Sequence, residues 1–462
     1  MTSLFASLGI AREALIAQQT GLNVTQNNIS NVNTPGYTRQ RADLVPGDAV
    51  ANFTYQSGMG VRLDSIISYR DRLVDYRLNQ ELQRFGELSY AAASLEQIES
   101  VVNEHAGAGL QSVISAFFNS FTALANAPED ASLRQQVLAR AEHMALQFRT
   151  VYEQLQSVQR MQELAITDTV QEINTLSAGI ARLNGEIAAF RGAGGNENTL
   201  RDQRQQQLDR LAQLVDIAYF ESESGTLTVM TRQGALLAVG KESHPWSAAS
   251  TAADTVRIEV DGVDVTSRID AGKLGALLEM HGVRIPGYLA SLDEMAAAIV
   301  ARVNEQHAQG TDLDGLAGGY FFAPIAPGAN AGAARNMSVA ITEIDRIAAA
   351  GAGGGPGDNA NALGLGRIQD ELLMAGGNAT IHQYYANLLF RIGMDAGSCR
   401  ESLRTQEQIL TQVQNQRDAI SGVNLDEEAI DLLRYQKAYE ANARFIQLVD
   451  GLTEELLRLI GG

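Results

Sequence analysis

The stretch SLFASLGIAREALIAQQTGLNVTQNNISNVNTPGY, residues 3–37, decides how the chain is organised. Its apolar side chains recur at intervals that alternate between four and three residues, which places them on one face of a helix. They are Leu4, Leu8, Ala11, Leu15, Leu22, Ile29 and Val32. Asn33-Thr34-Pro35-Gly36 ends the helix, because proline cannot continue it and glycine favours a turn. The sequence therefore predicts an amphipathic helix over residues 4–32.

The opposite face of this helix lacks the charges that a surface helix normally turns to water. Arg12 and Glu13 are the only charged residues between Met1 and Val32, and amides occupy the other polar positions. Those amides are Gln18, Gln19, Asn23, Gln26, Asn27, Asn28 and Asn31. Neutral amides can hydrogen-bond across an interface without the desolvation cost of an ion. Several protein neighbours are therefore expected around the helix; the alternative is a disordered tail with accidental spacing.

The C-terminal residues predict a matching helix. Asn424 is a candidate N-cap, Glu427 stands three residues later, and acidic residues fill the first turn. The predicted contacts join Leu8, Leu15, Leu22 and Ile29 to Leu432, Tyr439, Phe445, Val449, Leu452 and Leu456. A short coiled coil with so many amides is marginal alone, so both ends are expected to be disordered in the free monomer and helical after assembly.

Between the ends, the pattern predicts a mainly α chain with a small β insert, an α+β fold. Helical periodicity covers residues 73–102, 110–124 and 131–191, and it resumes after residue 272 and again from residue 381. Residues 216–268 alternate with period two and contain the hairpin dipeptide Asp261-Gly262. The predicted rod is nested: residues 1–45 and 420–462 form a terminal coiled coil, 46–215 and 269–419 an elongated bundle, and 216–268 a β domain.

Composition narrows the classes of partner. The 462 residues carry a formal net charge of −19, which argues against nucleic acids and against anionic membrane surfaces. No apolar run approaches the roughly 20 residues of a membrane-spanning helix. The residues Met1 to Phe5 lack the basic start of a cleavable secretory signal, and the single cysteine, Cys399, cannot form an intrachain disulfide. Other proteins are the expected partners.

No residue pattern predicts catalysis, a metal or a cofactor. The six histidines include no pair spaced at i and i+4, so a zinc site is not expected. Asp312-Leu313-Asp314-Gly315 lacks the later ligands of a calcium loop and is interpreted as a turn. Gly364-Leu365-Gly366 lacks the context of a nucleotide site, and Cys399 lies on an apolar ridge that predicts packing. The sequence therefore predicts a protein that is not an enzyme.

Two terminal motifs resemble a known family. Asn27-Asn28-Ile29-Ser30-Asn31-Val32-Asn33-Thr34-Pro35-Gly36-Tyr37 resembles the N-terminal motif of flagellar rod, hook and hook-associated proteins, with Asn31, Asn33, Pro35, Gly36 and Tyr37 as its markers. Residues 421–428, SGVNLDEE, followed by LRYQKAY at 433–439, are similar to the hook-associated protein 1 family in particular. Residues 198–204, 310–315 and 320–322 also look like internal landmarks of that family.

The resemblance implies a structural subunit of the junction between the flagellar hook and filament. It further implies export without a cleaved signal through the flagellar type III apparatus, after a transient cytoplasmic stage, to an extracellular position. The implied partners are other copies of the chain, the hook protein, a second hook-associated junction protein, and a cytoplasmic chaperone that holds the C-terminal helix. Three alternatives stay open: another axial subunit such as hook or distal rod protein, an enzyme on a helical scaffold, and a secreted effector that acts on membranes.

Overall fold

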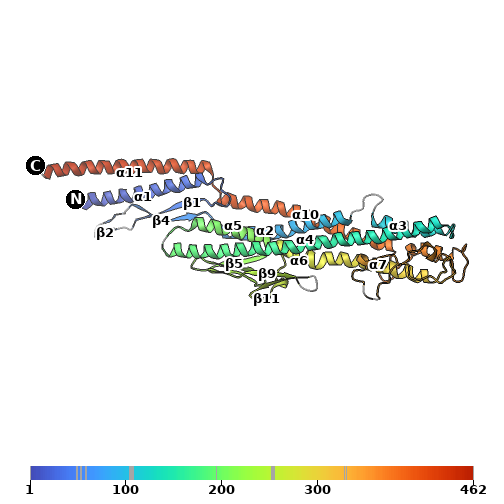
Figure 1. Ribbon diagram of the computed structural model, residues 1–462. Coiled ribbons are helices and arrows are strands. Elements are labelled where there is room, and N and C mark those ends of the chain that lie inside the picture. Colours follow the sequence, from blue (N-terminus) through green and yellow to red (C-terminus); the bar gives the residue numbers. More distant parts are fainter. Residues whose placement is uncertain are drawn as a thin grey trace.

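The chain folds into an elongated rod, in which a pair of terminal helices extends from one end of a longer helical bundle (Figure 1). The computed structural model describes residues 2–47, 50–52, 55–57, 60–102, 109–193, 195–250, 255–326, 328 and 330–460. Both chain ends lie at the same tip of the rod. Across these residues, no helix is both long enough and apolar enough to cross a membrane. The mainly helical α+β class is confirmed.

The terminal pair consists of α1 (Thr2–Ser30) and α11 (Leu425–Ile460), which lie side by side. A hairpin of β1 (Gln40–Pro46) and β4 (Val61–Ser68) packs against α1, and β2 (Val50–Asn52) pairs with β3 (Tyr55–Ser57). The sequence did not predict this hairpin, since residues 40–46 contain three charged or proline positions and alternate weakly. The predicted domain boundary between residues 45 and 46 falls inside the β1–β4 ladder.

The bundle is built from the helices α2 (Arg72–Val102), α3 (Leu110–Leu124), α4 (Ala131–Gly192), α5 (Asn198–Leu214), α6 (Gly272–Glu279), α7 (Ile285–Ala308) and α10 (Ile381–Ser421). The predicted ranges 73–102, 110–124 and 131–191 agree closely with α2, α3 and α4, and the predicted helix from residue 381 is α10. Helix α5 was not predicted from the sequence. The 62-residue α4 begins where the Asp130 side chain accepts bonds from the amides of Ser132 and Leu133. A single turn of π-helix, Met280–Arg284, joins α6 to α7.

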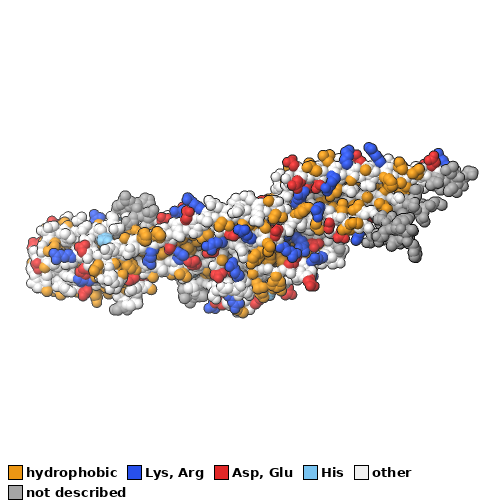
Figure 2. Space-filling view, turned by 180° about the vertical axis from the view of Figure 1, so that it is seen from behind, with side chains coloured by type: hydrophobic (Ala, Val, Ile, Leu, Met, Phe, Trp, Pro, Cys, Tyr) orange, Lys and Arg blue, Asp and Glu red, His pale blue; other side chains and the backbone are white. Residues whose placement is uncertain are grey.

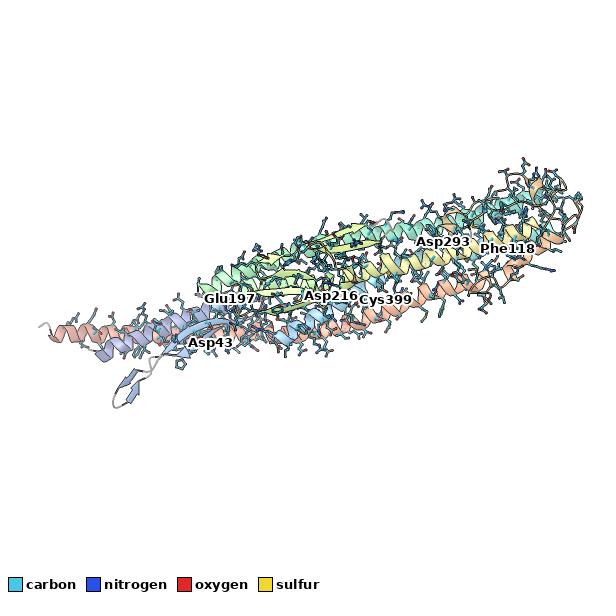
Figure 3. The ribbon with its side chains drawn as sticks, turned by 90° about the horizontal axis from the view of Figure 1, so that it is seen from below. Asp43, Phe118, Glu197, Asp216, Asp293 and Cys399 are labelled. Atoms are coloured by element: carbon cyan, nitrogen blue, oxygen red, sulfur yellow. The ribbon has the colours of Figure 1, made fainter. Side chains whose placement is uncertain are left out.

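Two hydrophobic clusters fill the bundle. The cluster at the end far from the termini contains the aromatic side chains of α3 with Phe321 and Phe322, and Figure 3 marks it by Phe118. The second cluster joins α2, α4 and α5 to the β domain. Every buried member of both clusters lies between Leu78 and Val413, which excludes the terminal pair from the core. The bundle therefore holds its own apolar interior.

The β insert packs on α4 as two small antiparallel sheets. One contains β5 (Ile217–Glu221), β6 (Leu227–Thr231), β7 (Leu236–Val239) and β8 (Glu242–Ser243); the other contains β9 (Trp246–Ser250), β10 (Val256–Val260) and β11 (Val263–Asp264). The predicted Asp261-Gly262 hairpin turn is confirmed, and both residues have positive φ. Asn174 and Asn184 of α4 bond to the backbone of the two sheets and fix their position.

Residues 309–326 and 330–380 form irregular loops at the far end of the bundle, with the short helices α8 (Ala333–Asn336) and α9 (Ala360–Arg367). Short 3-10 turns occur at Thr266–Arg268, Ile344–Arg346 and Ile368–Asp370. Asp312 accepts hydrogen bonds from the backbone amides of Asp314 and Leu316, so its carboxylate stabilises this turn. Nε2 of His307 accepts from Ala348 N at 2.9 Å, and Nδ1 donates to Gly319 O at 2.8 Å, which gives this buried histidine a packing role.

Candidate assembly surface on the terminal pair

Small side chains form the buried face of α1. They are Ala11, Ala14, Ala17, Gly21, Val24 and Thr25. A Cβ atom at Gly21 would come within 2.6 Å of the Tyr435 ring, so glycine allows the two helices to approach closely here. The larger residues predicted for this contact, Leu8, Leu15, Leu22 and Ile29, lie beside this face and are half-buried in a single copy.

Some residues of the predicted apolar ridge of α11 are buried or half-buried, and others are exposed. Val449 is buried at 3% exposure and Leu432 is half-buried, in keeping with a contact to α1. Tyr439, Phe445 and Leu452 remain 38–45% exposed. The side chain of Leu456, the last residue of the predicted set, lies outside the described residues. One copy of α1 therefore leaves part of this ridge uncovered.

An exposed stripe runs along α11, and we call it the outward stripe. It consists of Ile430, Leu433, Arg434, Lys437, Arg444, Leu448 and Leu452, which fall within an arc of about 100° around the helix. Ile430, Leu433 and Leu448 are 66%, 57% and 62% exposed. Figure 2 shows hydrophobic side chains spread along the terminal pair among charged ones. Large exposed apolar surface of this kind marks a protein interface. The sequence alone did not separate this stripe from the residues that face α1.

A buried polar cluster ties the base of α1 to the base of α11. The Asn28 side chain donates to Gln40 O at 2.8 Å and to Glu428 Oε2 at 2.9 Å. Its own oxygen accepts from the Tyr37 hydroxyl at 2.8 Å and from Gln40 N at 3.0 Å. Arg39 Nε donates to Glu428 Oε1 at 2.6 Å, and its guanidinium also contacts Glu427. Because Glu428 is only 2% exposed, these charge-assisted bonds fix the start of α11.

The motif residues of the N-terminal segment lie between Asn28 and Arg39, and Tyr37 is itself part of this cluster. Asn31 bonds back to Asn27 and accepts from the Thr34 hydroxyl, which shapes the turn after α1. Gly36 has φ +73, and Asn33 and Pro35 are exposed. Burial, followed by the charges of Asp202 and Glu428, raises the pKa of Tyr37 to about 12. Tyr37 is therefore a neutral hydrogen-bond donor at physiological pH.

Asn424 caps α11 as predicted, because its side chain accepts from Asp426 N at 3.0 Å. Glu427, however, contacts Arg39 with its carboxylate. Among the described residues, no group of three or more histidine, cysteine or acidic side chains could hold a metal ion.

Comparison with known proteins agrees with this geometry. The flagellar hook-associated protein 1 of Bacillus subtilis is 31% identical over 100% of this chain and 99% of its own length. The chain belongs to the flagellar hook-associated protein 1 family. The namesake proteins of Escherichia coli and Salmonella typhimurium are 27% and 25% identical, each over 97% of this chain.

Three family models match separate parts of this hook-associated protein 1 family member. The helical domain of the flagellar hook-associated protein FlgK matches residues 95–322, within the bundle and the β insert. The C-terminal model of the basal body rod FlgEFG proteins matches residues 414–459, and the basal body rod protein model matches residues 8–38. The rod-type models thus coincide with the two helices of the terminal pair.

A solved structure of the flagellar hook junction protein FlgK from Burkholderia pseudomallei has the same fold. Its TM-score is 0.68 at 18% identity, and the match covers 75% of this chain and 100% of that chain. Members of this family are structural components of the flagellum, and this chain is one of them.

Proposed function

We propose that this protein forms the junction zone between the flagellar hook and filament, by assembling with copies of itself through α1 and α11. The outward stripe of α11 carries the proposal, because three of its apolar side chains are more than half exposed on a helix already paired with α1. A second copy would bury this apolar surface. In this proposal several copies form a ring through their terminal pairs. The bundle and the β domain of each copy lie outside that ring.

The wider partners follow from membership of the family. The hook protein would lie on one side of the ring, and a second hook-associated protein would lie on the other. Export through the flagellar type III apparatus, without a cleaved signal, would bring the chain outside the cell. A cytoplasmic chaperone would cover the C-terminal helix before export, since an exposed apolar stripe invites premature association.

The test is complementation of a strain that lacks the gene. We expect that strain to carry hooks without filaments, and the wild-type chain to restore the filaments. Leu452→Asp should fail to restore them, because it places a charge in an interface that must lose water, while the unfolding temperature of the bundle stays unchanged. Leu164→Asp is the matched control: Leu164 is 68% exposed on α4, outside the terminal pair. Electron microscopy and filament counts give the readout.

Another axial subunit, such as hook or distal rod protein, is the competing function. The two rod-type family models at the chain ends favour it. The same strain distinguishes the two, because loss of a hook or rod subunit would remove the hooks themselves. A Leu452→Asp chain that restored filaments normally would contradict the role of α11.

A further inference from the structure

One face of α5 contacts three chain segments that connect the terminal pair to the bundle. We call the meeting place the joint, and the segments are residues 31–39, 66–72 and 417–424. The contributing side chains of α5 are Asn198, Asp202, Gln206 and Asp209, which follow one another at helical spacing. Figure 3 places Glu197, the residue before α5, at the end of the bundle nearest the terminal pair.

Three of these side chains each form a hydrogen bond with a different segment of the joint. Asn198 Nδ2 donates to Ile66 O of the hairpin at 2.8 Å. Gln206 Nε2 donates to Pro35 O, in the turn after α1. Asp209 Oδ2 accepts from Arg417 at 3.1 Å, near the end of α10. A single helical face therefore holds the segments that enter and leave the terminal pair.

Asp202 is the most deeply buried contact of this face, at 5% exposure. Its Oδ2 accepts from Thr38 N at 3.1 Å, and its Oδ1 accepts from Arg70 at 2.9 Å. Arg70 also lies 3.4 Å from the carboxylate of Asp75. Burial raises the pKa of Asp202, and the bonds from Thr38 and the charge of Arg70 act against that rise. The Asp202 carboxylate therefore bonds to two segments of the joint at once, to residues 31–39 through Thr38 and to residues 66–72 through Arg70.

The two described core clusters do not extend into the terminal pair. No buried member of the two described core clusters comes from α1, the β1–β4 hairpin or α11. A cleft of about 600 Å³ lies at the joint, lined by Asp202, Gln206, Asp209, Arg70 and Arg417 among others. Because directional polar bonds surround an open cleft here, they determine how the terminal pair is held relative to the bundle.

We propose that this face of α5 sets the angle between the terminal pair and the bundle, with Asp202 as its positioning residue. The inference rests on the proposed function, since an assembly through α1 and α11 requires every copy to present those helices in one orientation. It also gives a role to residues 198–204, a family-like motif that the terminal interface does not use.

The angle can be measured with two spin labels. In a Cys399→Ser background, Gln447→Cys on α11 and Gln171→Cys on α4 provide exposed attachment points. Gln447 lies 22 residues beyond the start of α11, about 33 Å along its axis, so a tilt of about 10° moves it by about 6 Å. Asp202→Asn should broaden the distance distribution by an amount of this order and reduce attachment to hook ends about tenfold.

The expected signature is a changed angle in a folded molecule. Circular dichroism and the unfolding temperature of the bundle should be retained in Asp202→Asn. Gln206→Ala removes an exposed contact of the same face, should fold in any case, and should broaden the distribution less. Asp168→Asn, at an exposed acid of α4, should leave the distribution and the attachment unchanged.

Two results would overturn the inference. One is an unaltered distance distribution in both Asp202→Asn and Gln206→Ala, whatever their attachment to hooks. The other is an equal broadening in the Asp168→Asn control. Neither result bears on the assembly role of α11, which the Leu452→Asp complementation tests separately.

Discussion

At the residue scale, Asp216 is a buried acid whose environment opposes its charge. The residue is fully buried between α5 and β5; Oδ2 accepts from Arg232 N at 3.2 Å, and Oδ1 has no hydrogen-bond partner among the described residues. Burial, reinforced by the charge of Asp270, raises the pKa of Asp216 to about 7. An unfolded aspartate titrates near pH 4. Between about pH 4 and pH 7, Asp216 is therefore mostly protonated in the folded state and mostly ionised in the unfolded state.

The sign of the pH effect follows from that difference. Between the two pKa values the native state holds more protons than the unfolded state, so the contribution of Asp216 to stability decreases as pH rises. Asp216→Asn removes the charge, and it should increase the free energy of unfolding at pH 8 by about 1–2 kcal/mol, with little gain near pH 5. Chemical denaturation at both pH values, with Asp168→Asn as the control, measures the change. A gain of equal size at both pH values would contradict the explanation.

At the element scale, the base of the terminal pair depends on the contact between Arg39 and Glu428. Glu428→Gln keeps the shape of the side chain and removes its charge, so the contact between this buried side chain and the Arg39 guanidinium weakens. We expect the terminal pair to lose about 2 kcal/mol of stability, measured as faster amide exchange in residues 7–30 and 425–455 while the bundle is unaffected.

Glu427→Gln is the matched control for that variant. Glu427 contacts the same arginine, but its side chain is 57% exposed, so its pairing should contribute less than about 1 kcal/mol. Similar exchange rates in the two variants would show that burial of Glu428 has no special role. Rapid exchange of both helices in the unaltered chain would instead support the expectation that the free ends are disordered.

Periodicity predicted most of the long helices well, missed α5 and the β1–β4 hairpin, and predicted contacts poorly. The range 110–124 matches α3 at both ends, because a compact aromatic helix is bounded by Gly109 and by the turn before Pro128. The faces of α1 and α11 were harder to assign, because small side chains such as Ala14 and Ala17 form the buried face of α1 and the larger apolar residues lie beside it. Their orientation depends on the bond between Arg39 and Glu428, which are 389 positions apart, and on Gly21 meeting Tyr435. Local spacing contains no information about such contacts.

At the scale of the whole molecule, the rod divides into a bundle with an apolar core and a terminal pair with an exposed apolar surface. The two core clusters of the bundle include no buried residue before Leu78 or after Val413. Polar contacts at the joint connect the parts, so loss of the terminal pair exposes little of the core. Under the proposed assembly, this arrangement would let α1 and α11 change partners without unfolding the bundle.

Residues 69–421 should therefore fold without the terminal pair. This fragment keeps α2 to α10 and loses mainly polar contacts, such as those from Thr38 to Asp202 and from Arg39 to Ser421. We expect its unfolding temperature to lie within about 5 °C of the bundle transition in the full chain. It should sediment as a monomer and show no attachment to hook ends, because both α1 and α11 are missing. Calorimetry, sedimentation and the hook-end assay test these statements together, and a fragment that unfolds without a cooperative transition would show that the bundle depends on the terminal helices for its stability.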